Sequence, residues 1–129
     1  MESSVVENKC VADAINAIIY DIIRPVQAKW WYDIESGAAL RRNIGEMLML
    51  TVTELAEACE GHRKDLMDDH LPHRKMFEVE LADAVIRIFD IAGGLGLDLG
   101  GAIVEKNNYN ASRQDHTHEA RRAANGKKY

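Results

Sequence analysis

Two pairs of acidic residues share one spacing and together have the chemistry of a metal site. Glu54-Leu-Ala-Glu57 and Glu80-Leu-Ala-Asp83 each place two carboxylates three residues apart. In a helix, this spacing puts both members of a pair on the same face, one turn apart. Carboxylate oxygens without histidine or cysteine favour hard cations such as Mg²⁺ or Mn²⁺ over zinc. The two pairs therefore predict a carboxylate site for a divalent cation.

The neighbours of these acids place them on the apolar side of their helices. The stripe around Glu54 contains Met47, Leu50, Thr51 and Ala58, and the stripe around Glu80 contains Phe77, Ala84 and Ile91. Burying several unpaired carboxylates together is untenable without compensating cations. Arg87 lies one turn after Asp83 and could pair with it, but one arginine cannot neutralise four acids. Divalent cations are the expected counter-charge.

The acids have two other interpretations. A single acid pair at this spacing is usually an ordinary pair of exposed surface charges. Two pairs inside apolar stripes, on helices joined by a short loop, favour a metal site instead. A di-iron carboxylate site needs Glu-x-x-His pairs on two helices. No histidine follows any of these acids at that spacing, so the di-iron alternative fails on ligand type.

Apolar residues recur at helical spacing along the chain, and alternation at period two is absent, which predicts an all-α fold. The expected helices cover residues 5–24, 41–64, 74–92 and 99–113. Pro25 should kink or end the first helix. Gly93, Gly94 and Gly96 are expected to end the third helix, and Asp98 to cap the fourth. The glycines are not a phosphate loop, because no strand precedes them.

Length and composition fit a single domain over residues 1–129, with a polar, basic and loosely ordered tail at 114–129. The chain is 47% hydrophobic and 29% charged, as in ordinary globular proteins. A net charge of −5 argues against binding to a nucleic-acid polymer. No apolar run is long enough to cross a membrane. Without a signal-peptide pattern or a disulfide framework, we expect a cytoplasmic protein.

The acid pairs, together with a segment further along the chain, resemble the MazG-like, all-α nucleotide pyrophosphohydrolase superfamily. The family pattern E-x-x-E, followed after a gap by E-x-x-D, stands here as the two acid pairs. The segment from Lys106 to Arg113 looks like the family's K-x-x-Y-N-x-x-R. A tryptophan pair before the second helix and a terminal Gly-Lys-Lys-Tyr are also similar to short single-domain members. The resemblance covers residues 25–129 and departs at Thr53, where some members carry a further acid.

The resemblance implies a four-helix bundle that assembles as a homodimer or homotetramer. It also implies Mg²⁺-dependent cleavage of a (deoxy)nucleoside triphosphate between the α and β phosphates, giving a nucleoside monophosphate and pyrophosphate. Glu54, Glu57, Glu80 and Asp83 would then hold the metal. Glu54 and Glu57 are the candidate catalytic residues, with Glu57 as the favoured general base for water.

Five further residues are candidates for substrate binding. Lys106, Asn110 and Arg113 share one helix face and, through the resemblance, are expected to hold phosphate oxygens. A solvated surface stripe is the alternative. Trp30 and Trp31 could stack on a base, and we expect one of the two to anchor the core instead.

Other functions remain open at this point. A phosphoribosyl-ATP pyrophosphohydrolase of histidine biosynthesis would use the same scaffold and chemistry. A non-catalytic nucleotide-binding or regulatory bundle would not need four buried acids. A purely structural bundle should not be stabilised by Mg²⁺, whereas a metal site in the folded state must raise stability by mass action.

Overall fold

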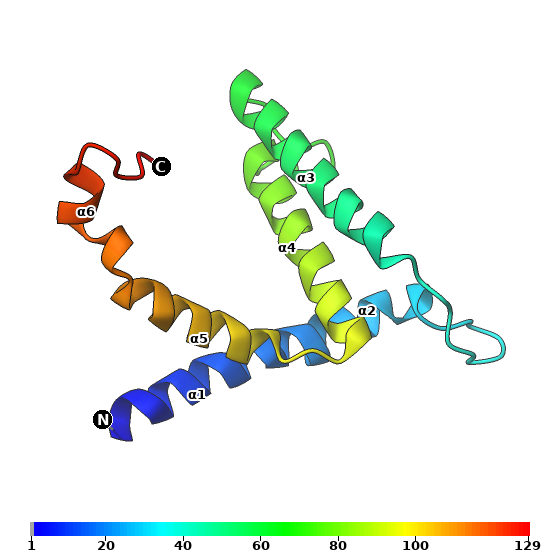
Figure 1. Ribbon diagram of the computed structural model, residues 1–129. Helices are drawn as coiled ribbons and strands as arrows, with labels where there is room; N and C mark the ends of the chain where they lie inside the picture. The colour runs from blue at the N-terminus through cyan, green and yellow to red at the C-terminus, as the bar shows by residue number, and fades with distance from the viewer. Residues whose placement is uncertain (1) are drawn as a thin grey trace. The chain divides into compact units, whose positions relative to one another are not determined.

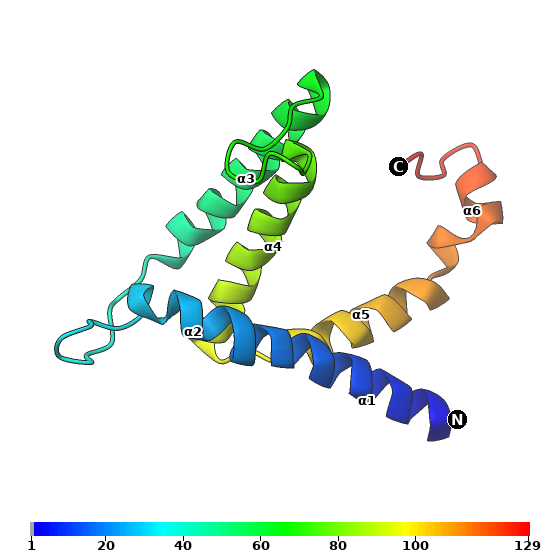
Figure 2. The same ribbon diagram turned by 180° about the vertical axis from the view of Figure 1, so that it is seen from behind.

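The computed structural model describes the backbone of residues 2–129 and the side chains of residues 4, 5 and 7–129. Its regular structure is helical, and the described chain has no strand beyond two isolated bridges, Tyr32 with Ala39 and Met67 with Lys75. The all-α prediction is confirmed (Figures 1 and 2). No helix in the described chain is both long and apolar enough to cross a membrane.

The helices fall into two compact units. The elements are α1 (Glu2–Ala17), the π-helical turn η1 (Ile18–Ile23), α2 (Arg24–Gln27), the 3₁₀ turn η2 (Ala28–Trp30), α3 (Ile44–Lys64), α4 (Met76–Leu95), α5 (Leu99–Ser112), the 3₁₀ turn η3 (Gln114–His116) and α6 (His118–Arg122). Residues 17–97 form the central unit. Residues 98–129, with the N-terminal residues up to 16, form the terminal unit.

Helices α3 and α4 run side by side as a hairpin in the central unit (Figures 1 and 2). The Asn43 side chain accepts a hydrogen bond from the backbone N–H of Glu46, so α3 begins at residue 44 rather than at the expected residue 41. Asp65 ends α3 in the left-handed conformation, with φ of 50°. In the connecting loop, the Asp68 carboxylate accepts the N–H groups of His70 and Leu71.

The glycines near the end of α4 correct one prediction. Gly93 and Gly94 lie inside the helix, which continues to Leu95, and only Gly96, with φ of 70°, caps it. A Cβ atom on Gly94 would lie 2.1 Å from ring carbons of Trp31. The missing side chain therefore makes room for the buried indole, whose Nε1 donates to Asp90 Oδ1 at 2.7 Å.

The expected break at Pro25 takes the form of a change in helix type that begins before the proline. The π-helical turn occupies Ile18–Ile23, and the backbone N–H of Arg24 donates to the carbonyl of Ile19. Pro25 then stands in the first turn of α2, directly after the π-helical turn. Trp30 and Trp31 follow in the turn after it, as expected.

The hairpin buries only part of the apolar surface of its helices. The buried apolar residues are Ile19, Trp31, Met47, Ala58, Ala84, Ile91 and Ala92. Further apolar residues on α3 and α4, here called the outer stripes, are 40% to 54% exposed: Leu48, Val52, Leu55, Leu81, Val85 and Ile88. Each helix has a single neighbour in the hairpin, and a single neighbour covers only one side of a helix.

In the terminal unit, α5 begins as predicted. Asp98 Oδ1 accepts the N–H of Gly101 at 2.9 Å. The Asn16 amide donates to Asp98 Oδ1 and accepts the N–H of Gly100, which ties the end of α1 to the start of α5. Helix α5 ends at Ser112, one residue before the expected boundary. The segment 114–129 contains η3 and α6.

Candidate metal centre

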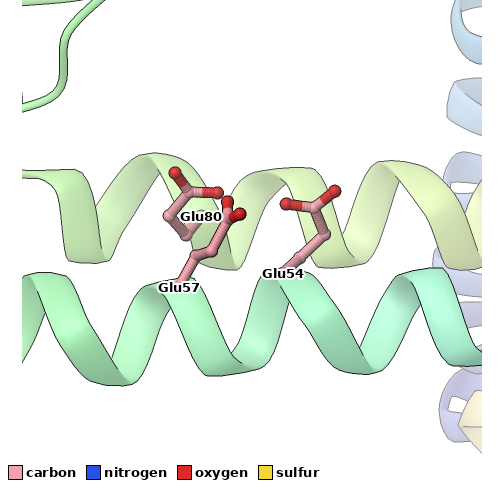
Figure 3. A group of neighbouring side chains, drawn as sticks. All are labelled: Glu54, Glu57 and Glu80. Carbon is pink, nitrogen blue, oxygen red and sulfur yellow. The ribbon is translucent and has the colours of Figure 1, made fainter.

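Three of the four predicted acids meet in the hairpin. Glu54 and Glu57 project from α3 and Glu80 from α4 (Figure 3). One carboxylate oxygen from each lies within 4.8 Å of the others. Glu54 and Glu80 are buried, with 8% and 9% of their surface exposed, whereas Glu57 is exposed. The spacing of three residues within α3 and the pairing of α3 with α4 therefore bring the carboxylates together.

Asp83, the fourth acid, lies at the edge of this group. It is half-buried on α4, one turn after Glu80, and is not one of the three residues whose oxygens lie within that distance. Burial, followed by the negative charge of Glu54, raises the pKa of Asp83. Its carboxylate is therefore close enough to interact with the other three.

The electrostatics of the group are repulsive. Burial, the negative charge of Glu57 and a hydrogen bond with Glu54 raise the pKa of Glu80 from its ordinary value of 4.5 to about 7. Such a shift is the response of a carboxyl group that lacks a sufficient positive partner. A bound cation would relieve this repulsion.

Arg87 is the cation that contacts this group in the described chain. Its Nε donates to Glu54 Oε1 at 2.5 Å, a bond that links α4 to α3. From its position one turn after Asp83, Arg87 was expected to pair with that acid. Its charge does lower the pKa of Asp83, but the hydrogen bond goes to Glu54. Four acids still face one arginine.

The donor set fits a hard divalent cation. Every candidate ligand atom is a carboxylate oxygen, and no histidine or cysteine joins the group in the described chain. Oxygen-only coordination suits Mg²⁺, Mn²⁺ and Ca²⁺ rather than zinc. The group can hold a metal ion, which would supply the positive charge that the buried carboxylates lack.

Two neighbouring pockets share three lining residues, Gln27, Arg87 and Asp90. The first pocket adjoins the acids and is lined by Glu54, Asp83 and Ile86 as well. The second is lined by Trp30, Arg42, Met47 and Leu50 as well. The two pockets together are called the cleft below; the acids line one end of it and Trp30 the other.

The structure gives the two tryptophans different environments. Trp31 is buried in the core against Gly94, while Trp30 is 55% exposed and lines the cleft. The guanidinium of Arg42 donates to the Trp30 carbonyl at 2.8 Å and lies 5.5 Å from the Trp31 ring centroid. Of the two residues, only Trp30 has a ring available to a ligand.

Of the predicted phosphate-binding residues, Lys106 and Asn110 lie on α5 and Arg113 directly follows its end, all in the terminal unit. Lys106 Nζ stands 4.7 Å from the Tyr109 ring centroid. Arg113 donates from Nε and Nη2 to the two carboxylate oxygens of Asp115, which holds the pKa of Asp115 well below its usual range. Asn110 is half-buried. The acids belong to the central unit, and the phosphate-binding role of these three residues stays a prediction.

Two polar residues of the cleft, Gln27 and Asp90, were not among the predicted site residues. Asp90 could have been predicted, because Glu80, Asp83, Arg87 and Asp90 follow one another at spacings of three and four on α4 and so share a helix face. Gln27 could not have been predicted. It follows a π-helical turn that the sequence pattern does not indicate, so the helix face on which it lies was not known.

Comparison with known proteins gives no match: no protein-family model, no curated protein and no solved structure resembles the chain closely enough to assign it.

Proposed function

We propose that this protein is a Mg²⁺-dependent nucleoside triphosphate pyrophosphohydrolase. The observation that carries the proposal is the group of closely spaced carboxylates, two of them buried, which faces a single arginine and adjoins a cleft with an exposed tryptophan. Carboxylates that need a divalent cation suit phosphate chemistry. A planar aromatic ring beside them suits a nucleobase.

In this proposal Glu54, Glu57, Glu80 and Asp83 hold Mg²⁺, for which Mn²⁺ can substitute. The bound ion supplies charge neutralisation for the phosphates and lowers the pKa of water. Glu57 is the general base. Its carboxylate is exposed to solvent and so to an attacking water, whereas Glu54 and Glu80 are buried between the helices.

The reaction balances as a hydrolysis between the α and β phosphates. Water oxygen forms a bond to the α-phosphorus, and the bond from that phosphorus to the bridging oxygen breaks. Glu57 accepts the proton of the water. The products are a nucleoside monophosphate and pyrophosphate, which leaves with the bridging oxygen.

The remaining predicted residues take substrate-binding roles. Trp30 stacks on the base from the far end of the cleft, and Trp31 supports it from the core. A phosphate-binding role for Lys106, Asn110 and Arg113 is supported by the resemblance alone, and Arg113 would have to release the carboxylate of Asp115 to take it. A cytoplasmic location is part of the proposal, because that compartment holds the nucleoside triphosphate pool.

The test is product analysis with a panel of NTPs, dNTPs, modified nucleotides and phosphoribosyl-ATP, each with Mg²⁺. We expect monophosphate and pyrophosphate from at least one triphosphate. Turnover of phosphoribosyl-ATP alone would reassign the substrate. Diphosphate plus orthophosphate would contradict the proposed bond. Nucleotide binding without turnover would make the protein a regulatory binding module.

We further propose that a second copy of the chain covers the outer stripes and completes a four-helix bundle with two hairpins, as a homodimer or a dimer of dimers. An apolar surface of this extent is rarely left exposed on a monomer, and a two-fold contact pairs the same stripe on both copies.

Light scattering during size exclusion should give at least a dimer. Val85→Glu should reduce it to monomers, while Ile34→Glu, at a position 83% exposed in a loop, should not. A monomeric wild type contradicts the assembly.

A further inference from the structure

Arg87 stands at the junction of the two pockets. It lines both, and with Gln27 and Asp90 it is shared by the acid end and the tryptophan end of the cleft. Its side chain is 41% exposed, although its Nε is hydrogen-bonded to the side chain of Glu54, which is only 11% exposed. Arg87 therefore combines a buried partner with an open side toward the cleft.

Most of the donors of this guanidinium are unused. Arginine carries five N–H groups in a planar fork. The described chain provides a hydrogen-bond acceptor only for Nε, through Glu54. Nη1 and Nη2 retain four N–H groups on the part of the residue that reaches furthest from α4. Their planar arrangement matches two oxygens of a phosphate group.

The partner of Arg87 is itself a candidate metal ligand. In the structure, the arginine is the counter-charge of Glu54 and also acts on Asp83. A cation bound by Glu54 would weaken the attraction between Glu54 and Arg87, because it would neutralise part of the charge of the acid. The guanidinium would then be available to bind a second anion, and an anion in the cleft would lie next to it.

We propose that Arg87 is a phosphate-binding residue of the cleft, positioned by Glu54 through Nε and binding the α-phosphate of a nucleotide through its remaining N–H groups. This inference rests on the proposed function. It adds a phosphate contact within the central unit, next to the carboxylates, separate from the candidate residues of the terminal unit. The position between the acids and Trp30 suits the phosphate that joins the base end of a nucleotide to its metal-bound end.

The experiment measures binding rather than turnover. Each of the four deoxynucleoside monophosphates and its parent nucleoside are titrated by calorimetry into protein saturated with Mg²⁺. We expect the monophosphate of the preferred base to bind the wild type more tightly than its nucleoside. Arg87→Ala should weaken monophosphate binding by roughly 10- to 100-fold, the usual loss for a charged hydrogen bond, and leave nucleoside binding unchanged.

Controls separate this role from a structural one. Arg74→Ala removes another Arg–Glu pair, with Glu78, outside the cleft, and should leave both affinities unchanged. Arg87→Gln can still donate to Glu54 and serves if the alanine variant does not fold. It should also lose the preference for monophosphate.

Two results would overturn the inference. One is an Arg87 variant that binds monophosphate as the wild type does. The other is a wild type that binds monophosphate no more tightly than nucleoside. Neither depends on hydrolysis, so a failure here is distinct from a failure of the nucleotide panel, which tests the proposed function.

Discussion

Glu57→Gln is expected to lower kcat for triphosphate hydrolysis by roughly 10²–10⁴-fold, the usual contribution of a general base. The amide keeps the size of the side chain but cannot accept a proton from water, and it is a weaker ligand for a cation. Because Glu57 is the exposed member of the group, the substitution should leave stability nearly unchanged. The measurement is steady-state kinetics at saturating Mg²⁺.

Glu60→Gln is the matched control for this prediction. Glu60 lies on the same helix, three residues later, and is an exposed partner of Lys64 at the surface. Its variant should retain wild-type kcat. Asp83→Asn should also lose most activity, since it removes a ligand beside the cleft. Wild-type turnover by Glu57→Gln would refute the assignment of the base.

The metal-free protein should become less stable as pH rises from 5 to 8. Glu80 has a pKa of about 7 in the folded state and 4.5 ordinarily. Below pH 4.5 both states hold the proton. Between 4.5 and 7 the unfolded chain ionises first, so the folded state loses relative stability, and above 7 the loss is complete. A shift of this size corresponds to about 3 kcal/mol, or roughly 10 °C in Tm.

Mg²⁺ should restore this loss, because it binds the ionised carboxylates of the folded state. Glu80→Gln should remove most of the pH dependence, raise the metal-free Tm at pH 8 and weaken the response to Mg²⁺. Glu78→Gln, which alters an exposed acid on the same helix, should behave as the wild type. Calorimetric scans across this pH range check the prediction. A metal-free Tm that rises with pH, or is indifferent to Mg²⁺, would contradict it.

The acidic group was predictable because it depends on local geometry. Helical periodicity decides which residues of α3 and α4 share a face, and Glu54 and Glu80 are buried as their apolar neighbours indicated. The expectation that all four acids are buried was wrong for Glu57, which is exposed at the edge of the hairpin, and Asp83 is only half-buried. The same periodicity did not separate buried from exposed apolar residues. Met47 is buried and its neighbour Leu48 is exposed, although both are apolar residues of α3. The difference depends on how many other helices pack against α3, which the sequence does not reveal.

Features that depend on contacts between distant segments were harder to anticipate. Gly94 was expected to help end the helix, but it lies inside α4, where the indole of Trp31 occupies the space that a side chain would fill. The hydrogen bond from Arg87 to Glu54 joins α4 to α3. The sequence does not show which residues of the two helices face one another, so Asp83, four residues before Arg87, was the expected partner.

The π-helical turn at Ile18–Ile23 also determines which side chains reach the cleft. A π-helical turn holds about one residue more than an α-helical turn, so every later residue is rotated by about 100° around the axis relative to an uninterrupted α-helix. Ile19 is anchored in the core, and the angular phase of Gln27 and Trp30 is set from that anchor. Chain length within this turn, rather than side-chain chemistry, thus selects the residues offered to a ligand. A gain or loss of one residue there would exchange the lining of the cleft in a single step and leave the carboxylates of α3 and α4 in place.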